Sequence, residues 1–205
     1  MFKNGVILSM LFMKNRKRNR KQGFDYSCDN LYFVTICVQN RICCLGSVIF
    51  DVVVETGRKL SVRNSDEIHS NELHKRMELN NFGKIVYDRI MWLEEQYEYV
   101  ILHSFVVMPN HVHIIVEIDR LILQQNESDS SEPSEGIKIK SLSSLIGAFK
   151  TTSSKMIHQE GFLDFAWQRS FHDHIIRNEK SYLNICNYIV SNPEKWAVDT
   201  FFKKD

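Results

Sequence analysis

The sequence predicts an α+β fold, a ferredoxin-like sandwich in which two helices cross a four-stranded antiparallel sheet. Three observations lead to this prediction. Short apolar segments rich in β-branched residues alternate with longer segments of helical periodicity. Their order is strand, helix, strand, strand, helix, strand, with one additional helix behind, and no internal repeat is visible. The chain has 205 residues and is 43% hydrophobic, which is enough for one core, so a single domain over residues 23–205 is expected.

The first half of this order begins with a buried strand over residues 31–39 (LYFVTICVQ), which are rich in aromatic and β-branched side chains. From Val48 to about Asn80 the sequence is polar and charged and keeps no sustained period, so we expect loops or short irregular elements there. Residues 81–99 carry apolar side chains at helical spacing between charged ones, which predicts an amphipathic helix.

The second half opens with a hairpin, because the apolar segments 102–107 and 111–118 are separated by the turn residues Met108-Pro109-Asn110. A helix is expected over residues 141–159, behind a serine start. The alternation in SFHDHII (170–176) then predicts the fourth strand.

The additional helix is expected over residues 179–191, where Asn192-Pro193 should stop it. It carries Tyr188 near its end. Two polar insertions, near residues 55–80 and 124–140, interrupt the domain, and the serine-rich acidic stretch within the second should not pack.

Charge gives no global indication of a nucleic-acid partner, because 26 lysines and arginines stand against 25 acids, for a net charge of +1. A dense basic run lies in the segment 1–22, which we expect to be flexible. Such a run suits phosphate contacts, and a solvated tail is the alternative. The run consists of Lys14, Arg16, Lys17, Arg18, Arg20 and Lys21.

Export and membrane insertion are not expected. The apolar stretch over residues 5–13 is too short to span a bilayer, and its charges follow it, whereas a signal peptide carries them in front. The five cysteines are odd in number and contain no C-x-x-C spacing, which favours reduced thiols in the cytoplasm. Translation could start at Met1 or at Met13.

Two pairs of residues could carry chemistry. His111 and His113 are two apart on a predicted strand, so both imidazoles should emerge on one face and could hold a metal ion. Tyr188 and Asn192 are four apart, one helical turn from each other. The alternatives are half-buried histidines satisfied by neighbours, an ordinary core tyrosine and a helix-ending asparagine.

A further group around the last strand could contact nucleic acid, with an aromatic ring for base stacking and basic groups for phosphates. Core packing of the tryptophan and surface ion pairs of the arginines are the alternatives, and His174 could instead support a metal site from the second layer. The group consists of Trp167, Arg169, His174 and Arg177.

These residues belong to a larger pattern. The segments YFVTICVQNR, VVMPNHVHIIVEI, WQRSFHDHIIRNE and NYIVSNPEKW follow one another here in the order seen in the tyrosine transposases associated with repetitive extragenic palindromes (REP). The chain resembles this family from about residue 23 to residue 196. The family belongs to the single-tyrosine His-hydrophobic-His transposases.

The resemblance implies a metal-dependent enzyme that cuts and joins single-stranded DNA at hairpins. By motif, His111 and His113 match the metal ligands, Tyr188 matches the nucleophile, and Asn192 matches the third ligand, with Mg²⁺ or Mn²⁺ as the ion. The tyrosine would form a 5′-phosphotyrosine. A monomer is favoured over a homodimer. A hairpin-binding protein that no longer cuts, and a metal-dependent hydrolase without a covalent intermediate, are the alternatives.

Overall fold

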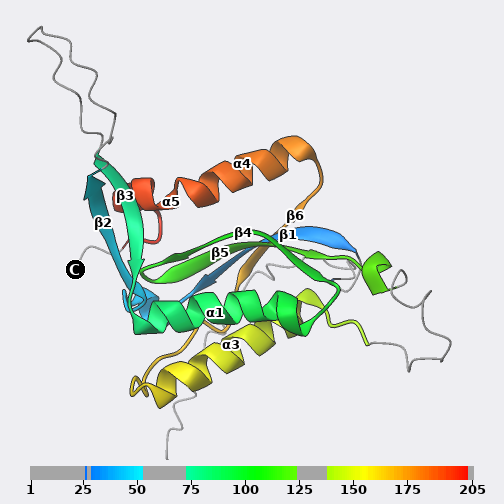
Figure 1. The fold of residues 1–205 in the computed structure, drawn as a ribbon, viewed down its shortest axis with the longest axis horizontal. Coiled ribbons are helices and arrows are strands. Elements are labelled where there is room, and N and C mark those ends of the chain that lie inside the picture. Colours follow the sequence, from blue (N-terminus) through cyan, green and yellow to red (C-terminus); the bar gives the residue numbers. More distant parts are fainter. Residues whose placement is uncertain (1–25, 27–28, 53–72, 124–137, 203–205) are drawn as a thin grey trace, which may run out of the picture.

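The computed structural model describes residues 26, 29–52, 73–123 and 138–202. Its main sheet has the strand order β4-β5-β1-β6, and all neighbours are antiparallel. Helices α1 and α3 cover one face and α4 covers the other (Figure 1), so the expected α+β sandwich is confirmed. The elements are β1 (Asn30–Cys37), α1 (Asn81–Gln96), β4 (Val100–Met108), β5 (His111–Ile118), α3 (Leu142–Gln159), β6 (His172–Ile176) and α4 (Glu179–Val190).

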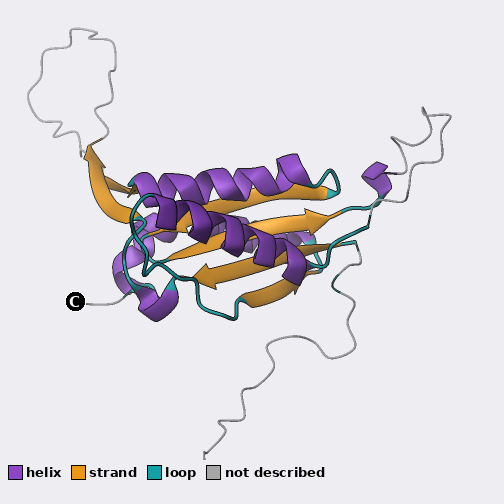
Figure 2. Cartoon of the chain, turned by 90° about the horizontal axis from the view of Figure 1, so that it is seen from below, coloured by secondary structure: helices purple, strands orange, loops and turns teal. Residues whose placement is uncertain are grey.

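The larger core lies between the sheet and the pair α1 and α3, which run side by side across the strands (Figure 2). Strand side chains alternate between the two faces. On β5, Val112, Ile114 and Val116 therefore enter this core, where they join Ile90 and Phe149 from the helices. The other side chains of β5 point to the α4 face, and these include both histidines.

Helix boundaries follow local capping. Asn80 accepts a hydrogen bond from the backbone N–H of Gly83 and starts α1, and Ser141 does the same for α3 through the N–H of Ser144. Helix α1 ends at Gln96, three residues before the expected end, because Tyr97 takes an extended conformation at the C-cap.

The expectation of loops between Val48 and Asn80 was wrong in the part that the structure describes. Strands β2 (Gly46–Val52) and β3 (Leu73–Leu79) form a separate two-stranded antiparallel sheet beside the end of the main sheet (Figure 1). Charged side chains such as Arg76 line an exposed strand, and twenty residues, 53–72, lie between the two partners, so no hairpin signal exists. Most of the polar insertion, 53–72, lies outside the described residues.

Helix α4 ends before Asn192, as expected, with Ser191 as its C-cap. Asn192 then begins the short helix α5 (Asn192–Lys195), and a 3-10 turn, η2 (Trp196–Val198), follows. The backbone N–H of Lys75 in β3 donates to Glu194 Oε1 at 2.6 Å and ties α5 to the small sheet. Within the described residues, no helix has the length and apolar character needed to cross a bilayer.

Candidate metal and nucleophile site

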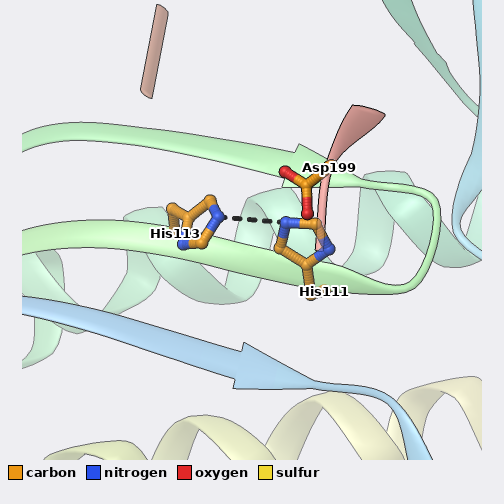
Figure 3. A group of neighbouring side chains, drawn as sticks. All are labelled: His111, His113 and Asp199. Atoms are coloured by element: carbon orange, nitrogen blue, oxygen red, sulfur yellow. Dashed lines mark hydrogen bonds between the residues drawn. The ribbon is translucent and has the colours of Figure 1, made fainter. Parts of the chain in front are cut away.

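The two histidines of the H-x-H motif face each other at the start of β5. Both side chains lie on the α4 face of the sheet and are almost completely buried, with 0% and 1% of their surface exposed. Their Nε2 atoms are 3.0 Å apart (Figure 3). Both imidazoles therefore lie on one face of the strand, as the sequence predicts.

The opposite ring nitrogens are held by neighbours that orient the rings. The Nδ1 of His111 lies 2.9 Å from Asn110 Oδ1, and the amide of Asn110 is fixed because its Nδ2 donates to the carbonyls of Arg41 and Phe201. His111 therefore donates from Nδ1 and keeps a lone pair on Nε2. The Nδ1 of His113 lies 2.8 Å from Thr35 Oγ1. A ligand histidine is commonly oriented by such an outer hydrogen bond.

Burial keeps both imidazoles neutral. It lowers the pKa of His111 to about 2, with smaller contributions from His113 and Arg41, and it lowers the pKa of His113 to about 3. A neutral imidazole is the form that binds a metal ion. The pair is therefore ready to act as ligands at physiological pH.

The phenol of Tyr188 joins the pair from α4. Its oxygen lies 3.2 Å from His113 Nε2, and its ring meets Phe33 edge-on. Burial raises the pKa of Tyr188, the carboxylate of Asp199 raises it further, and a hydrogen bond from Asn192 opposes both. The side chain is 36% exposed, so the nucleophile candidate borders solvent while the histidines do not.

Asn192 has an oxygen without a partner. The side chain is 1% exposed, and its Nδ2 donates to Asp199 Oδ2 at 3.3 Å. Its Oδ1 is buried and has no hydrogen-bond partner among the described residues. Leaving a buried acceptor unsatisfied costs about 1–3 kcal/mol. A ligand for this oxygen would remove that cost.

Asp199 is a site residue that the sequence analysis missed. One of its carboxylate oxygens and a ring nitrogen from each of His111 and His113 lie within 4.8 Å of one another (Figure 3). Its Oδ1 accepts from the N–H of Phe201 at 2.6 Å, and the Phe201 ring lies 4.6 Å from that of His111. Eleven residues separate Asp199 from Tyr188 and no motif marks it, so the sequence carries no signal for it.

This donor set fits a divalent metal ion. Two neutral imidazoles and a carboxylate oxygen converge, as the ligands of a cation do. The Asn192 side chain, whose Oδ1 has no partner among the described residues, contacts the same carboxylate through its Nδ2. Carboxylate and amide oxygens suit Mg²⁺ and Mn²⁺, whereas imidazoles suit later transition metals.

The residues that the sequence suggested for contact with nucleic acid do not share one location. Trp167 is packed in the core instead of facing DNA: it is 8% exposed, its Nε1–H donates to Ser153 Oγ at 2.9 Å, and it contacts Phe149 and Phe165. Arg169, His174 and Arg177 lie on the surface around β6. The basic run from Lys14 to Lys21 lies outside the described residues.

Comparison with known proteins gives three similarities. No protein-family model matches the chain. An uncharacterized protein of Haemophilus influenzae is 28% identical over 193 residues, which cover 92% of this chain and 93% of the relative. A REP-associated tyrosine transposase solved with a REP hairpin is 17% identical, with a TM-score of 0.47 over 88% of this chain and 74% of that one.

A candidate transposase from Deinococcus radiodurans is 14% identical, with a TM-score of 0.39 over 84% of this chain and 97% of that one. Both solved structures are described as transposases.

Proposed function

We propose that this protein is a metal-dependent transposase that nicks and joins single-stranded DNA at hairpins through a phosphotyrosine. The observation that carries the proposal is the meeting of Tyr188 with the histidine pair, its phenol oxygen 3.2 Å from His113 Nε2. A nucleophile and metal ligands on one buried cluster are the parts that such a reaction requires. The sequence motifs of the family contribute the same residues.

The chain's own residues would act as follows. His111, His113 and the Oδ1 of Asn192 hold Mg²⁺ or Mn²⁺, and Asp199 lies within reach as a further ligand. An ion held by these residues would polarise the scissile phosphate and offset its negative charge. Thr35 and Asn110 keep the two imidazoles oriented.

Tyr188 supplies the nucleophile. A bond forms between its oxygen and phosphorus while the bond from phosphorus to the 3′-oxygen breaks; the phenol loses its proton, and the leaving 3′-oxygen gains one. The amide of Asn192 donates towards the phenol and favours its anion. The phosphotyrosine bond conserves the free energy of the phosphodiester bond that was broken. A second 3′-hydroxyl can therefore attack the phosphotyrosine, release Tyr188 and join two strands.

The strand would reach the site along α4. Tyr188 is 36% exposed, whereas the histidines are enclosed and Phe201 packs on His111. A phosphate that arrives beside Tyr188 meets the nucleophile before the ligands, without displacing Phe201.

The decisive experiment incubates the full chain with end-labelled single-stranded hairpin oligonucleotides and Mn²⁺, followed by a denaturing protein gel. We expect a labelled band at the mass of protein plus DNA, absent after chelation and absent in Tyr188→Phe, with Tyr87→Phe as the matched exposed control. Hairpin binding without an adduct would support the non-cutting alternative. Cleavage that persists in Tyr188→Phe would support a hydrolase.

Metal titration with Mn²⁺, followed by electron paramagnetic resonance, tests the ligand set. We expect Asn192→Ala to weaken Mn²⁺ binding by about tenfold or more, as losses at metal sites commonly do. Asn184→Ala, on the exposed side of α4, serves as control. Asp199→Asn keeps the shape of the side chain and removes its charge, so a comparable loss there would add Asp199 to the ligands.

A further inference from the structure

Arg41 lies at the rim of the metal and nucleophile site and has no part in the chemistry described above. It ends the short 3-10 turn η1 (Gln39–Arg41), which follows β1, and its side chain is exposed. Its guanidinium packs over Phe201, with Cζ 5.0 Å from the ring centroid, and Nη1 donates to the carbonyl of Thr200 at 3.0 Å. The ring of Phe201 lies 4.6 Å from that of His111. Two contacts therefore connect the guanidinium with a candidate metal ligand.

The backbone of this turn has a conformation that arginine rarely adopts. Asn40 and Arg41 both have a φ of 57°, in the left-handed region, which asparagine tolerates and arginine disfavours. Two hydrogen bonds of the Arg41 backbone hold the turn: its N–H donates to Val38 O at 3.0 Å, and its carbonyl accepts from Asn110 Nδ2 at 3.2 Å. Asn110 also orients His111. The turn and the candidate ligand are therefore fixed by the same side chain.

The guanidinium keeps most of its capacity to bind an anion. It has five N–H donors and a permanent positive charge. One donor is used at Thr200, and no carboxylate of the described residues forms an ion pair with Arg41. Its charge acts on the site, because burial, His113 and Arg41 together lower the pKa of His111 to about 2. An exposed cation beside a candidate metal site suits a phosphate.

Holding the C-terminal segment does not account for the whole side chain. The contacts with Thr200 and Phe201 use one donor and one face of the guanidinium, and the side chain remains exposed. The remaining donors include parallel N–H groups, which match two oxygens of one phosphate.

The contacts of the site form a series that begins at the nucleophile candidate. Tyr188 contacts His113, and His113 faces His111. Phe201 packs on His111, and Arg41 packs on Phe201. A strand that arrives along α4 would place its scissile phosphate at the first member of this series. A phosphate further along the same strand would then pass Arg41.

We propose that Arg41 binds a phosphate of the single-stranded DNA other than the scissile one, through two N–H groups of its guanidinium. The inference rests on the proposed function for the identity of the strand. A phosphate held there fixes the position of the strand relative to the metal ligands, since Asn110 holds both the turn and His111. The contact positions the strand and carries no base preference.

Fluorescence anisotropy over a salt series, with chelator present, tests the contact without any need for cleavage or metal. The probe is a labelled hairpin oligonucleotide with a single-stranded flank. We expect Arg41→Gln to weaken binding about tenfold and to make the slope of log K against log salt shallower by about 0.7, the share of one single-strand phosphate contact.

Two further variants separate charge from geometry. Arg41→Lys keeps the charge, so it should keep the salt slope and still bind more weakly, because an ammonium group cannot pair with two oxygens in parallel. Lys155→Gln removes one exposed charge from α3, on the face opposite α4 (Figure 1), and should behave as the unaltered protein.

Neutral linkages identify the phosphate. A methylphosphonate removes the charge of one phosphate, and it can be placed at each position of the single-stranded flank in turn. We expect one position at which the neutral linkage weakens binding to the unaltered chain about tenfold but has no effect on binding to Arg41→Gln. The two changes would then remove the same contact.

A purely structural role of Arg41 predicts a different result. If Arg41 only holds the segment that carries Asp199, Arg41→Gln should weaken Mn²⁺ binding and leave the salt slope unchanged. We expect instead that Arg41→Gln and Lys155→Gln bind Mn²⁺ equally. The structural result, a linkage scan without a position coupled to Arg41, or coupling at the scissile phosphate itself would overturn the proposal.

The salt series and the adduct experiment can fail separately. If Tyr188 forms no adduct but Arg41→Gln has the shallower slope, the phosphate contact stands and the strand-transfer chemistry falls. If the adduct forms and Arg41→Gln has the same slope as Lys155→Gln, the transposase function stands and the phosphate contact falls.

Discussion

At the scale of single residues, Thr35 shows how the sheet orients a candidate metal ligand. It lies on β1 directly opposite His113 on β5, it is 5% exposed, and its hydroxyl is 2.8 Å from His113 Nδ1. The register of the two strands therefore sets the orientation of the imidazole. The sequence shows a threonine in a buried strand and nothing that connects it to His113.

Replacing Thr35 by valine keeps the volume and removes the hydroxyl. We expect Thr35→Val to weaken Mn²⁺ binding by about 10- to 100-fold, because the ring loses the contact that orients it. Calorimetric titration of the purified chain checks this. Thr151→Val, at an exposed position of α3, is the control. Unchanged affinity in Thr35→Val would show that His113 is oriented by other contacts.

The sequence motifs identify some residues of the candidate site and leave out others. His111, His113 and Tyr188 were found from spacing and resemblance, and the structure brings them together. Asp199 and Thr35 were not found, because their contacts join positions 86 or more residues apart in one case and 78 in the other. The sequence left base stacking and core packing open for Trp167, and the structure places it in the core, where its Nε1–H donates to Ser153.

At the scale of elements, the packing of α1 depends on a glycine. A Cβ atom at Gly83 would overlap the carbonyl oxygen of Leu45 and press on Leu79. The first turn of α1 therefore approaches the segment before β2 as closely as only glycine allows. Gly147, in the middle of α3, has open space around its Cα.

These two glycines make a matched pair of substitutions. We expect Gly83→Ala to destabilise the protein by about 1–3 kcal/mol through steric overlap. Gly147→Ala should stabilise it by about 0.5–1 kcal/mol, because alanine loses less backbone entropy in a helix. Urea denaturation of both variants gives the two free energies of unfolding. The same sign for both would contradict the close approach at Gly83.

Helix α4 is attached to the sheet more weakly than the other long helices. Ile189 is its one buried residue, and it packs with Ile115 and Ile176 in a small cluster. A bulge in β4 supplies a second attachment: His103 lies at the register shift, within 3.3 Å of the Tyr182 hydroxyl and 2.6 Å of Glu117. The nucleophile candidate therefore lies on the long helix with the fewest buried residues.

Hydrogen exchange should reveal this difference. We expect the amides of α4 to exchange faster than those of α1 and α3, because few buried contacts must open to expose them. Mass spectrometry of the metal-free protein can compare the three helices directly. Addition of Mn²⁺ should slow exchange at the end of α4, since Asn192 follows it. Equal protection of all three helices would contradict the weak attachment.

At the scale of the whole molecule, the charge balance limits how the proposed DNA substrate could be held. A net charge of +1 gives no general attraction to phosphate, so binding of that substrate would depend on local basic groups. The densest of these is the run of six between Lys14 and Lys21, which lies outside the described residues.

Replacement of the six basic residues by glutamine tests their contribution. We expect weaker hairpin binding and a slope of log K against log salt that is shallower by up to about 4, since each contact with single-stranded phosphate contributes about 0.7. Fluorescence anisotropy over a salt series measures both quantities. The double variant Lys203→Gln and Lys204→Gln is the control. An unchanged slope would assign the run to a solvated tail.

The sequence by itself determined the order in which the strands of the main sheet and the helices follow one another along the chain. It also determined the shared face of His111 and His113, and the helix that carries Tyr188. These follow from hydrophobic periodicity and spacing, which are local properties of the chain. Only the tertiary structure decided the pairing of β2 with β3 and the approach of Asp199 to the histidines. Each of these depends on register and packing between segments far apart in the sequence, where no local pattern records which residues will meet.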